Sequence, residues 1–316
     1  MNIRERMEVR ELFLHDYAAK SKDSKGREVY EEPDEVRTCY ARDRDRIIHS
    51  HAFRREQHKT QVFINPSNDH IMNRMTHTLE VAQIAKTIAV SLNLNEVLTE
   101  AIALGHDTAH TCFVHAGESA LNKICLDNGI AYGYKHAEAS YRRLNVLSGL
   151  NLTYEVLDGI RRHSGLSNGS DAETLEGQII QFADKIAYLT SDYENAISMG
   201  LVGGFEDLPK EVLNQLGNKK SKIIDTLIKS VINRSTDNPY IKMDDDCYGA
   251  FAEFRKFNFK NIYYHPRLVE SNNRAKMIVN CLFEYYKGQG QDIQGIVDNI
   301  AGMTDSFALN EFHSLL

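Results

Sequence analysis

The sequence is poor in the residues that interrupt helices. Proline occurs five times and glycine 19 times in 316 residues, and no long Ser/Gly-rich linker divides the chain. Because proline disrupts helix interiors, its scarcity favours a mostly helical protein. Apolar residues make up 42% of the chain, so the protein can bury a sizeable core and extensive disorder is not expected.

Features of secreted and membrane proteins are also lacking. The charged N-terminus MNIRERMEVRELF has no apolar stretch of a signal peptide. No run approaches the roughly 18 apolar residues that a membrane span needs. The cysteines are odd in number and form no CxxC pair, which argues against a disulfide framework. They are Cys39, Cys112, Cys125, Cys247 and Cys281. We therefore expect a soluble cytoplasmic protein without a membrane partner.

A general excess of positive charge is absent too. The formal net charge is -7, so a broadly basic nucleic-acid-binding surface is not indicated, although single-stranded nucleic acid stays open as a partner. Local arginine clusters could still hold phosphates. They lie at 42–46, 54–55, 142–143 and 161–162.

What is present is helical periodicity. Apolar residues recur at helical spacing over 72–92, with Met75, Leu79, Ala82, Ile84, Ala85, Ile88 and Ala89 expected to face inward. A second helix over 95–107 has Asn95 as a plausible N-cap. Further helices are expected at 116–128, 135–147, 153–165 and 174–200, whereas 61–64 and 238–243 read as a small hairpin or loops. The pattern predicts an all-α fold, with an N-terminal extension (1–40), a core (41–200) and a helical C-terminal part (201–316) packed on the core.

One stretch is unusually rich in titratable groups. GHDTAHTCFVHAGE, residues 105–118, holds three histidines and two carboxylates. His106 and Asp107 end a buried helix, and an imidazole beside a carboxylate suits a divalent metal ion. Two donors are too few for a metal site, so other helices must contribute.

Two residues in other apolar helices are candidate partners. Taken alone, His77 reads as an ordinary hydrogen-bonded core histidine, and Asp184 as a helix-interior carboxylate paired with Lys185 or an arginine. Burying an unpaired carboxylate costs several kcal/mol. A single metal site would account for His77, His106, Asp107 and Asp184 together.

The order His, His-Asp, Asp resembles the signature of the HD-domain metal phosphohydrolases. Longer stretches closely resemble the deoxyguanosine triphosphate triphosphohydrolase family over about residues 40–270. These stretches are RDRDRIIHSHAFRREQHKTQVF, NRMTHTLEVAQIA, EAIALGHDTAHTCFVHAGE, LTYEVLDGIRRHSG, EGQIIQFADKIAYLTSDYENAI and FRKFNFKNIYYHPRL. The resemblance implies a single large domain built on an HD-domain helical bundle.

The resemblance also implies a reaction and its catalytic groups. The expected substrate is a deoxynucleoside triphosphate (dNTP), with dGTP a candidate preferred base, and the products are deoxynucleoside and tripolyphosphate. The implied metal ligands are His77, His106, Asp107 and Asp184, and the implied catalytic groups are His110, His115 and Glu118. The ion could be Mn²⁺, Mg²⁺, Fe²⁺, Co²⁺ or Ni²⁺.

Substrate contacts are carried over in the same way. Arg74 and Lys185 would hold phosphates, and the lysine resembles the animal SAM-and-HD-domain triphosphohydrolase, since many bacterial relatives have an acid there. Arg54 and Arg55 are weaker phosphate candidates. Tyr188 and Asp192 follow Asp184 at i+4 and i+8 on one helix face. They would contact the deoxyribose and its 3′-hydroxyl, and Gln57 would also read that hydroxyl.

The chain departs from the family within the 105–118 stretch. The family usually writes HDLGHPPFGHAGE, whereas this chain has Thr108, Ala109, Thr111, Cys112 and Val114. No ligand or proton carrier is replaced, but the loop's fit to base and phosphate is open.

Alternative functions are another HD-domain phosphohydrolase, such as a 5′-nucleotidase or a signalling-nucleotide phosphodiesterase, and a non-catalytic nucleotide sensor. A homo-oligomer is expected because oligomers are common in the family.

Overall fold

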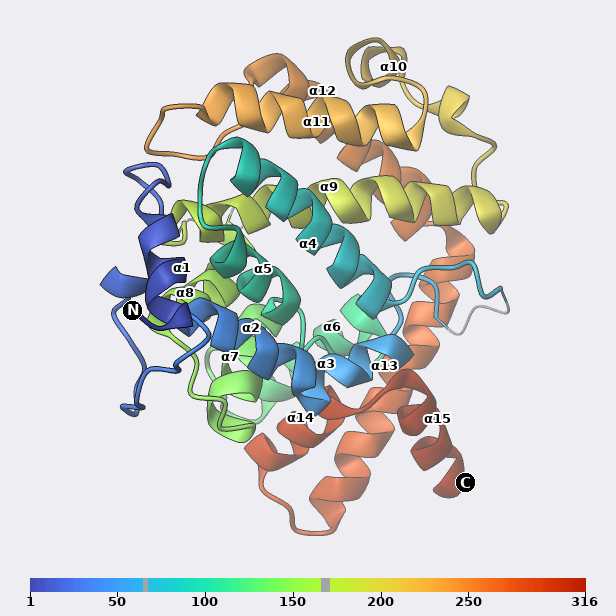
Figure 1. Ribbon diagram of the computed structural model, residues 1–316. Coiled ribbons are helices and arrows are strands. Elements are labelled where there is room, and N and C mark those ends of the chain that lie inside the picture. Colours follow the sequence, from blue (N-terminus) through green and yellow to red (C-terminus); the bar gives the residue numbers. More distant parts are fainter. Residues whose placement is uncertain (65–67, 166–170) are drawn as a thin grey trace.

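The computed structural model describes residues 1–64, 68–165 and 171–316, and its regular structure is helical (Figure 1). The α-helices are α1 (Ile3–Glu11), α2 (Cys39–His49), α3 (His51–Arg55), α4 (Arg74–Ser91), α5 (Glu96–Gly105), α6 (Val114–Asp127), α7 (His136–Tyr141), α8 (Tyr154–Arg162), α9 (Leu175–Ser198), α10 (Lys210–Leu216), α11 (Lys220–Ser235), α12 (Asp245–Asn258), α13 (Pro266–Gly288), α14 (Ile293–Gly302) and α15 (Asp305–Ser314). The all-α prediction is confirmed.

Extended pairing is limited to two isolated bridges in the described ranges, Arg27 with Thr153 and Thr60 with Asn73. The stretches 61–64 and 238–243 are therefore loops and not a hairpin. No helix in the part of the chain that the structure describes is long and apolar enough to cross a bilayer.

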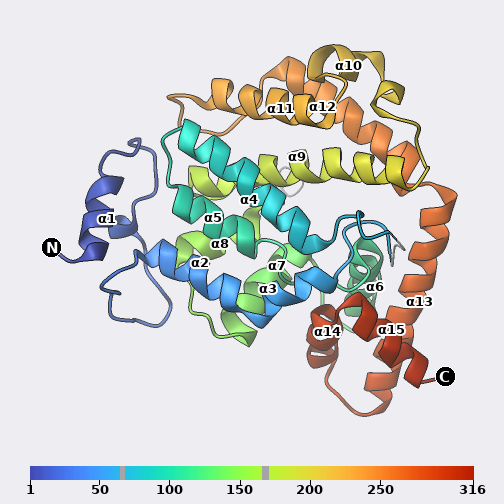
Figure 2. The same ribbon diagram turned by 45° about the vertical axis from the view of Figure 1, so that its right-hand side comes forward.

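Three long helices start at side-chain caps and form the centre of the molecule. The Asn73 side chain accepts the Thr76 amide at the start of α4, and Asn95 caps α5 as expected. Thr174 caps α9. α4 packs on both α5 and α9, α2 and α8 cover α5, and α11 and α12 lie over α9 (Figures 1 and 2).

The inward face of α4 differs at one position from the expected one. Leu79 is 53% exposed, whereas Val81 and Ile84 are buried. Leu79 and Val81 are two residues apart, about 200° around a helix of 3.6 residues per turn, so they cannot face the same core. The prediction for Leu79 was wrong because it followed hydrophobicity and not helical position.

Glycines allow α5 and α8 to approach closely. A Cβ on Gly105 would lie 2.6 Å from Ile160 Cδ1, and a Cβ on Gly159 would lie 2.5 Å from Ile102 Cδ1. Only glycine fits at both contacts without repacking. As a result, the end of α5, where His106 follows, lies beside the end of α8.

The buried apolar residues form two groups. The larger joins α2, α4, α5, α8 and α9 with α10, α11 and α12. The smaller, here called the C-terminal cluster, joins α6 with α13, α14 and α15 and includes Cys112 and Phe113 from the α5–α6 loop. The α5–α6 loop, which carries His110, therefore lies between the two groups, and His115 and Glu118 follow it on α6.

Candidate active site

Three helices bring the four proposed metal ligands together. His77 lies on α4, Asp184 lies on α9, and His106 and Asp107 follow α5. His77 Nε2 lies 3.1 Å from Asp184 Oδ1 and 4.0 Å from Asp107 Oδ2. His106 Nε2 lies 3.4 Å from Asp107 Oδ2 and 3.9 Å from Asp184 Oδ1. Bonds of about 2.1 Å to one tetrahedral ion place ligand atoms about 3.4 Å apart. Donor atoms of His77, His106 and Asp107 all lie within 4.8 Å of one another and could hold a divalent ion, and Asp184 lies beside both histidines of this group.

Hydrogen bonding prepares His106 to be a ligand. Its Nδ1–H donates to the Ala103 carbonyl at 2.6 Å, which fixes the tautomer and leaves Nε2 bare. That Nε2 is buried and has no hydrogen-bond partner among the described residues. A bare acceptor in a buried site is unfavourable unless something binds it. A divalent ion would satisfy it.

The carboxylates of the cluster are ionised. Burial would raise the pKa of Asp107, but the guanidinium of Arg74 outweighs it and holds the pKa well below the ordinary value. Burial would likewise raise the pKa of Asp184, but the contact with His77 keeps it low. Arg74 is itself 1% exposed and pairs directly with Asp107. The site thus presents two anionic ligands and one buried guanidinium.

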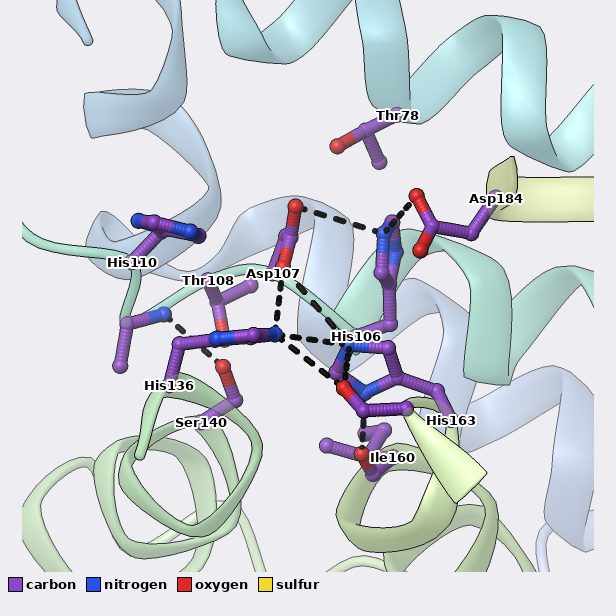
Figure 3. A network of polar contacts seen from close by, with 12 residues as sticks. Thr78, His106, Asp107, Thr108, His110, His136, Ser140, Ile160, His163 and Asp184 are labelled. Carbon is purple, nitrogen blue, oxygen red and sulfur yellow. Dashed lines mark hydrogen bonds and ion pairs between the residues drawn. The ribbon is translucent and has the colours of Figure 1, made fainter. Parts of the chain in front are cut away.

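Two histidines that the sequence analysis missed complete the cluster on its other side. His136 is the first residue of α7 and His163 follows α8, and in Figure 3 both rings point toward Asp107. Each Nε2 lies 3.9 Å from Asp107 Oδ1, and the two Nε2 atoms are 3.2 Å apart. These three donors could also hold an ion. His136 lies in the sequence KHAE and His163 in RRHSG. In each case the only sequence feature that could have indicated a site is a single histidine beside a helix end.

The two histidines differ in charge. His163 Nδ1–H donates to the Ile160 carbonyl at 2.7 Å, and burial lowers its pKa to about 3, so the ring is neutral. Burial works against the charge on His136 too, but Glu118 outweighs it and raises the pKa of His136 to about 9. His136 is therefore a fixed cation at neutral pH, suited to a phosphate group.

Glu118 interacts with all three histidines near it, and most closely with His136. Its Oε1 lies 2.9 Å from His136 Nδ1, whereas Oε2 lies 3.6 Å from His115 Nδ1 and 3.8 Å from His110 Nε2. Burial would raise the pKa of Glu118, but His136 outweighs it and the pKa lies far below the ordinary value. The structure thus brings the expected trio together and adds His136 to it.

The two other histidines of the trio occupy different surroundings. His110 is buried, which lowers its pKa well below the usual value, and its ring stacks on His136 with centroids 4.7 Å apart. The His115 side chain is 75% exposed. His115 can therefore exchange protons with solvent, whereas His110 stays neutral.

A cavity of about 620 Å³ opens from the metal ligands, a size typical of small-molecule sites. Of the expected substrate contacts, four line it: Arg74, Lys185, Tyr188 and Asp192. Asp192 accepts the Tyr263 hydroxyl at 2.6 Å, and burial raises the pKa of Asp192 to about 6. Cationic side chains that the sequence analysis did not select also line the cavity, namely Lys135, Arg255 and Lys276.

Two expected contacts lie elsewhere. Arg54 and Gln57 are exposed, and neither is among the described residues that line the cavity. Ala52 and Phe53 are the inward-facing residues of α3, so Arg54 points to solvent. Gln57 Nε2 lies 3.1 Å from His58 Nε2 on the surface. The weaker candidate Arg55 is half-buried and also lies outside this lining.

Comparison with known proteins identifies the family of the chain. A model of the HD domain matches residues 74–189, which span all four proposed metal ligands, and a model of the phosphohydrolase-associated domain matches 241–295. A solved structure of a hypothetical protein from Aquifex aeolicus has a TM-score of 0.53 and 20% identity. It covers 85% of this chain and 67% of its own, a similarity of fold alone.

Full-length relatives are closer. A deoxyguanosinetriphosphate triphosphohydrolase-like protein from Caldanaerobacter subterraneus is 46% identical over 100% of this chain and 96% of its own. Proteins of the same description from Clostridium perfringens and Geobacter sulfurreducens are 44% and 36% identical, over 100% and 96% of this chain and 98% and 94% of theirs. The chain belongs to the deoxyguanosinetriphosphate triphosphohydrolase family of HD-domain phosphohydrolases.

Proposed function

We propose that the protein hydrolyses dNTPs between the 5′ oxygen and the α-phosphorus, giving deoxynucleoside and tripolyphosphate. The observation that carries the proposal is one cavity lined by three of the four proposed metal ligands (His77, Asp107 and Asp184), by the buried cations Arg74 and Lys185, and by the exposed His115. A phosphohydrolase needs each of these three components.

His77, His106, Asp107 and Asp184 would hold the divalent ion, which polarises a phosphoryl oxygen and lowers the pKa of bound water. Arg74 and the His136 imidazolium would neutralise phosphate charge beside it. Lys185, whose pKa is lowered by burial, adds a cation on the α9 side. These groups bind and orient the triphosphate.

His115 would donate a proton to the 5′ oxygen when its bond to phosphorus breaks. Water supplies the oxygen that bonds to the α-phosphorus. The reaction consumes one water molecule, whose atoms are divided between the deoxynucleoside and the tripolyphosphate. Glu118 orients the neighbouring imidazoles, and the carboxylate of Asp192 would accept the 3′-hydroxyl.

The test is incubation of the protein with each of the four dNTPs, the ribonucleotides and 5′-dNMPs, with Mn²⁺ or Mg²⁺ in ¹⁸O-labelled water. We expect deoxynucleoside and labelled tripolyphosphate, and slower turnover of ribonucleotides because Tyr188 leaves little room at C2′. Release of nucleoside mono- or diphosphate would contradict the proposal. Hydrolysis of 5′-dNMP alone would favour the 5′-nucleotidase alternative.

A further inference from the structure

Two adjacent residues at the junction of the α5–α6 loop and α6 have backbone conformations that residues with side chains rarely adopt. φ is 59° at Phe113 and 53° at Val114, and the second is β-branched, which makes this region especially unfavourable. Strained conformations persist only where surrounding contacts maintain them. These residues stand between His110 and His115, so their conformation sets where both imidazoles lie.

One buried carboxylate from the C-terminal helices holds this strained turn. Asp305, the first residue of α15, is 7% exposed. Its Oδ1 accepts the Phe113 amide at 2.9 Å, and its Oδ2 accepts the Thr60 amide at 3.0 Å as well as the Thr60 hydroxyl. Charge-assisted bonds of this kind are stronger than neutral ones.

A buried lysine makes a parallel link. Lys59 is 2% exposed, and its ammonium donates to the His110 carbonyl and to the Ala301 carbonyl at 2.9 Å. The segment 59–60, the loop 110–113 and the segment 301–305 are therefore tied together. The apolar side chain of Phe113, 1% exposed, packs into the C-terminal cluster beside these contacts.

We propose that the C-terminal helices α14 and α15 set the geometry of the α5–α6 loop (residues 106–113, here called the catalytic loop) through Asp305 and Lys59. Asp305 is then a positioning residue for His110 and His115. The side chains of Asp305 and Lys59 contact none of the proposed metal ligands, and segment 59–60 meets α4 only at its start, where the Arg74 amide donates to the Lys59 carbonyl at 3.0 Å. Among the described residues, the carboxylate of Asp305 hydrogen-bonds Thr60 and Phe113 alone. The identity of the reaction rests on the proposed function, whereas the coupling itself does not.

The first test is the kinetics of Asp305→Ala and Asp305→Asn with dNTP substrate. We expect kcat to fall about 10- to 100-fold, because small displacements of reacting groups have effects of this size. KM should change less than about threefold, and bound metal per chain should stay at the wild-type value. The asparagine variant keeps one acceptor oxygen and should lose less.

The matched control is Asp298→Ala. This residue lies on α14 and pairs with Arg142 through contacts of 2.7–3.1 Å, but it touches no residue of the catalytic loop. Asp298→Ala removes the side-chain contact with Arg142 but leaves the Asp305 carboxylate and the Ala301 carbonyl, which make the proposed link, so its kcat should match that of the wild type. An equal fall in kcat for Asp298→Ala, or none for either Asp305 variant, would overturn the proposal. Loss of metal from both Asp305 variants would also overturn it.

Two further measurements separate positioning from stability. Replacement Val114→Gly lets this position adopt its positive φ without strain, so Asp305→Ala should lower kcat less in that background than in the wild type. Amide hydrogen exchange should rise in peptides covering 108–118 when Asp305 is replaced, and stay unchanged in Asp298→Ala.

The exchange measurement needs no activity. If the wild type releases no tripolyphosphate, the proposed function is wrong. Protection of the Phe113 amide from hydrogen exchange still tests whether Asp305 holds the turn. Unchanged exchange in both Asp305 variants would show that the carboxylate does not hold the turn.

Discussion

At the scale of residues, Asp107 joins two groups of side chains. Its Oδ2 faces His77, His106 and Arg74, while its Oδ1 faces His136 and His163. One carboxylate thus belongs both to the proposed metal site and to the cationic phosphate site. Removing it would leave Arg74 and the neighbouring imidazoles without their anion, which is costly in a buried site.

Asp184→Asn isolates the metal from the rest of the site. The variant keeps the size of the side chain but lacks the anionic donor, so we expect loss of most bound metal and a fall in kcat on the order of 10³-fold. Elemental analysis and the product assay measure both. Glu194→Gln, exposed on the same helix, should keep metal and activity. Full metal content in Asp184→Asn would refute the ligand assignment.

His115→Ala tests the proton donor. The side chain is 75% exposed, so the free energy of unfolding should change by less than about 0.5 kcal/mol. We expect kcat to fall about 10²- to 10⁴-fold, with unchanged metal content. His51→Ala, an exposed histidine on α3, is the control. Wild-type kcat in His115→Ala would point to another proton donor, whereas absence of activity from the wild-type protein itself would favour the non-catalytic sensor.

At the scale of elements, the start of α9 fastens two segments through Glu176. Its Oε1 accepts the Ala19 amide at 3.0 Å and the Asn95 amide at 2.9 Å, while Oε2 is buried without a partner among the described residues. Burial raises the pKa of Glu176 from 4.5 to about 7. The folded protein therefore holds this proton more tightly than the unfolded chain.

This shift predicts a pH dependence of stability. The contribution of the protonated group is fully present below pH 4.5 and is lost as the pH rises to about 7, a change on the order of 3 kcal/mol. Glu176→Gln cannot ionise at this position. Its free energy of unfolding, relative to that of the wild type, should therefore increase between pH 5 and pH 8. Urea titrations at both values measure the difference.

Glu173→Gln serves as the control for this experiment, because Glu173 is exposed beside Lys25 and its pKa is lowered. It should show no gain with rising pH. An equal stability difference between wild type and Glu176→Gln at the two pH values would contradict the prediction.

At the scale of the whole molecule, the proposed ion connects three helices of the larger apolar group. An ion that binds the folded state alone stabilises it by about 2.7 kcal/mol at 100 times its Kd, which corresponds to a rise in Tm on the order of 5 °C. We expect EDTA to lower Tm and Mn²⁺ to restore it, measured by calorimetry. Asp184→Asn should not respond, and a Tm that is insensitive to metal would count against the site.

Family membership and the all-α fold could be read from the chain because both rest on local patterns. Asn95 caps a helix through its own neighbours, and His106-Asp107 are adjacent whatever the packing. The predicted boundaries at 40 and 200, the homo-oligomer, the cytoplasmic location and the identity of the metal stay predictions.

Other features depended on which helices meet. His163 reaches Asp107 because glycines let α5 and α8 approach, and His136 reaches it from α7, which packs on α8. Glu118 lies closer to His136 than to the neighbouring His115. Arg54 and Gln57 lie outside the cavity because α3 turns its apolar residues inward.

The sequence by itself thus determined the helices and the Asn95 cap, since periodicity and capping act within a few residues, and through its family resemblance it proposed the four metal ligands. Only the tertiary structure decided the charge of His136, the surroundings of His115 and the strained turn held by Asp305. Each of these depends on side chains from distant segments meeting in a buried space, where the distance between groups sets their pKa and their hydrogen bonds.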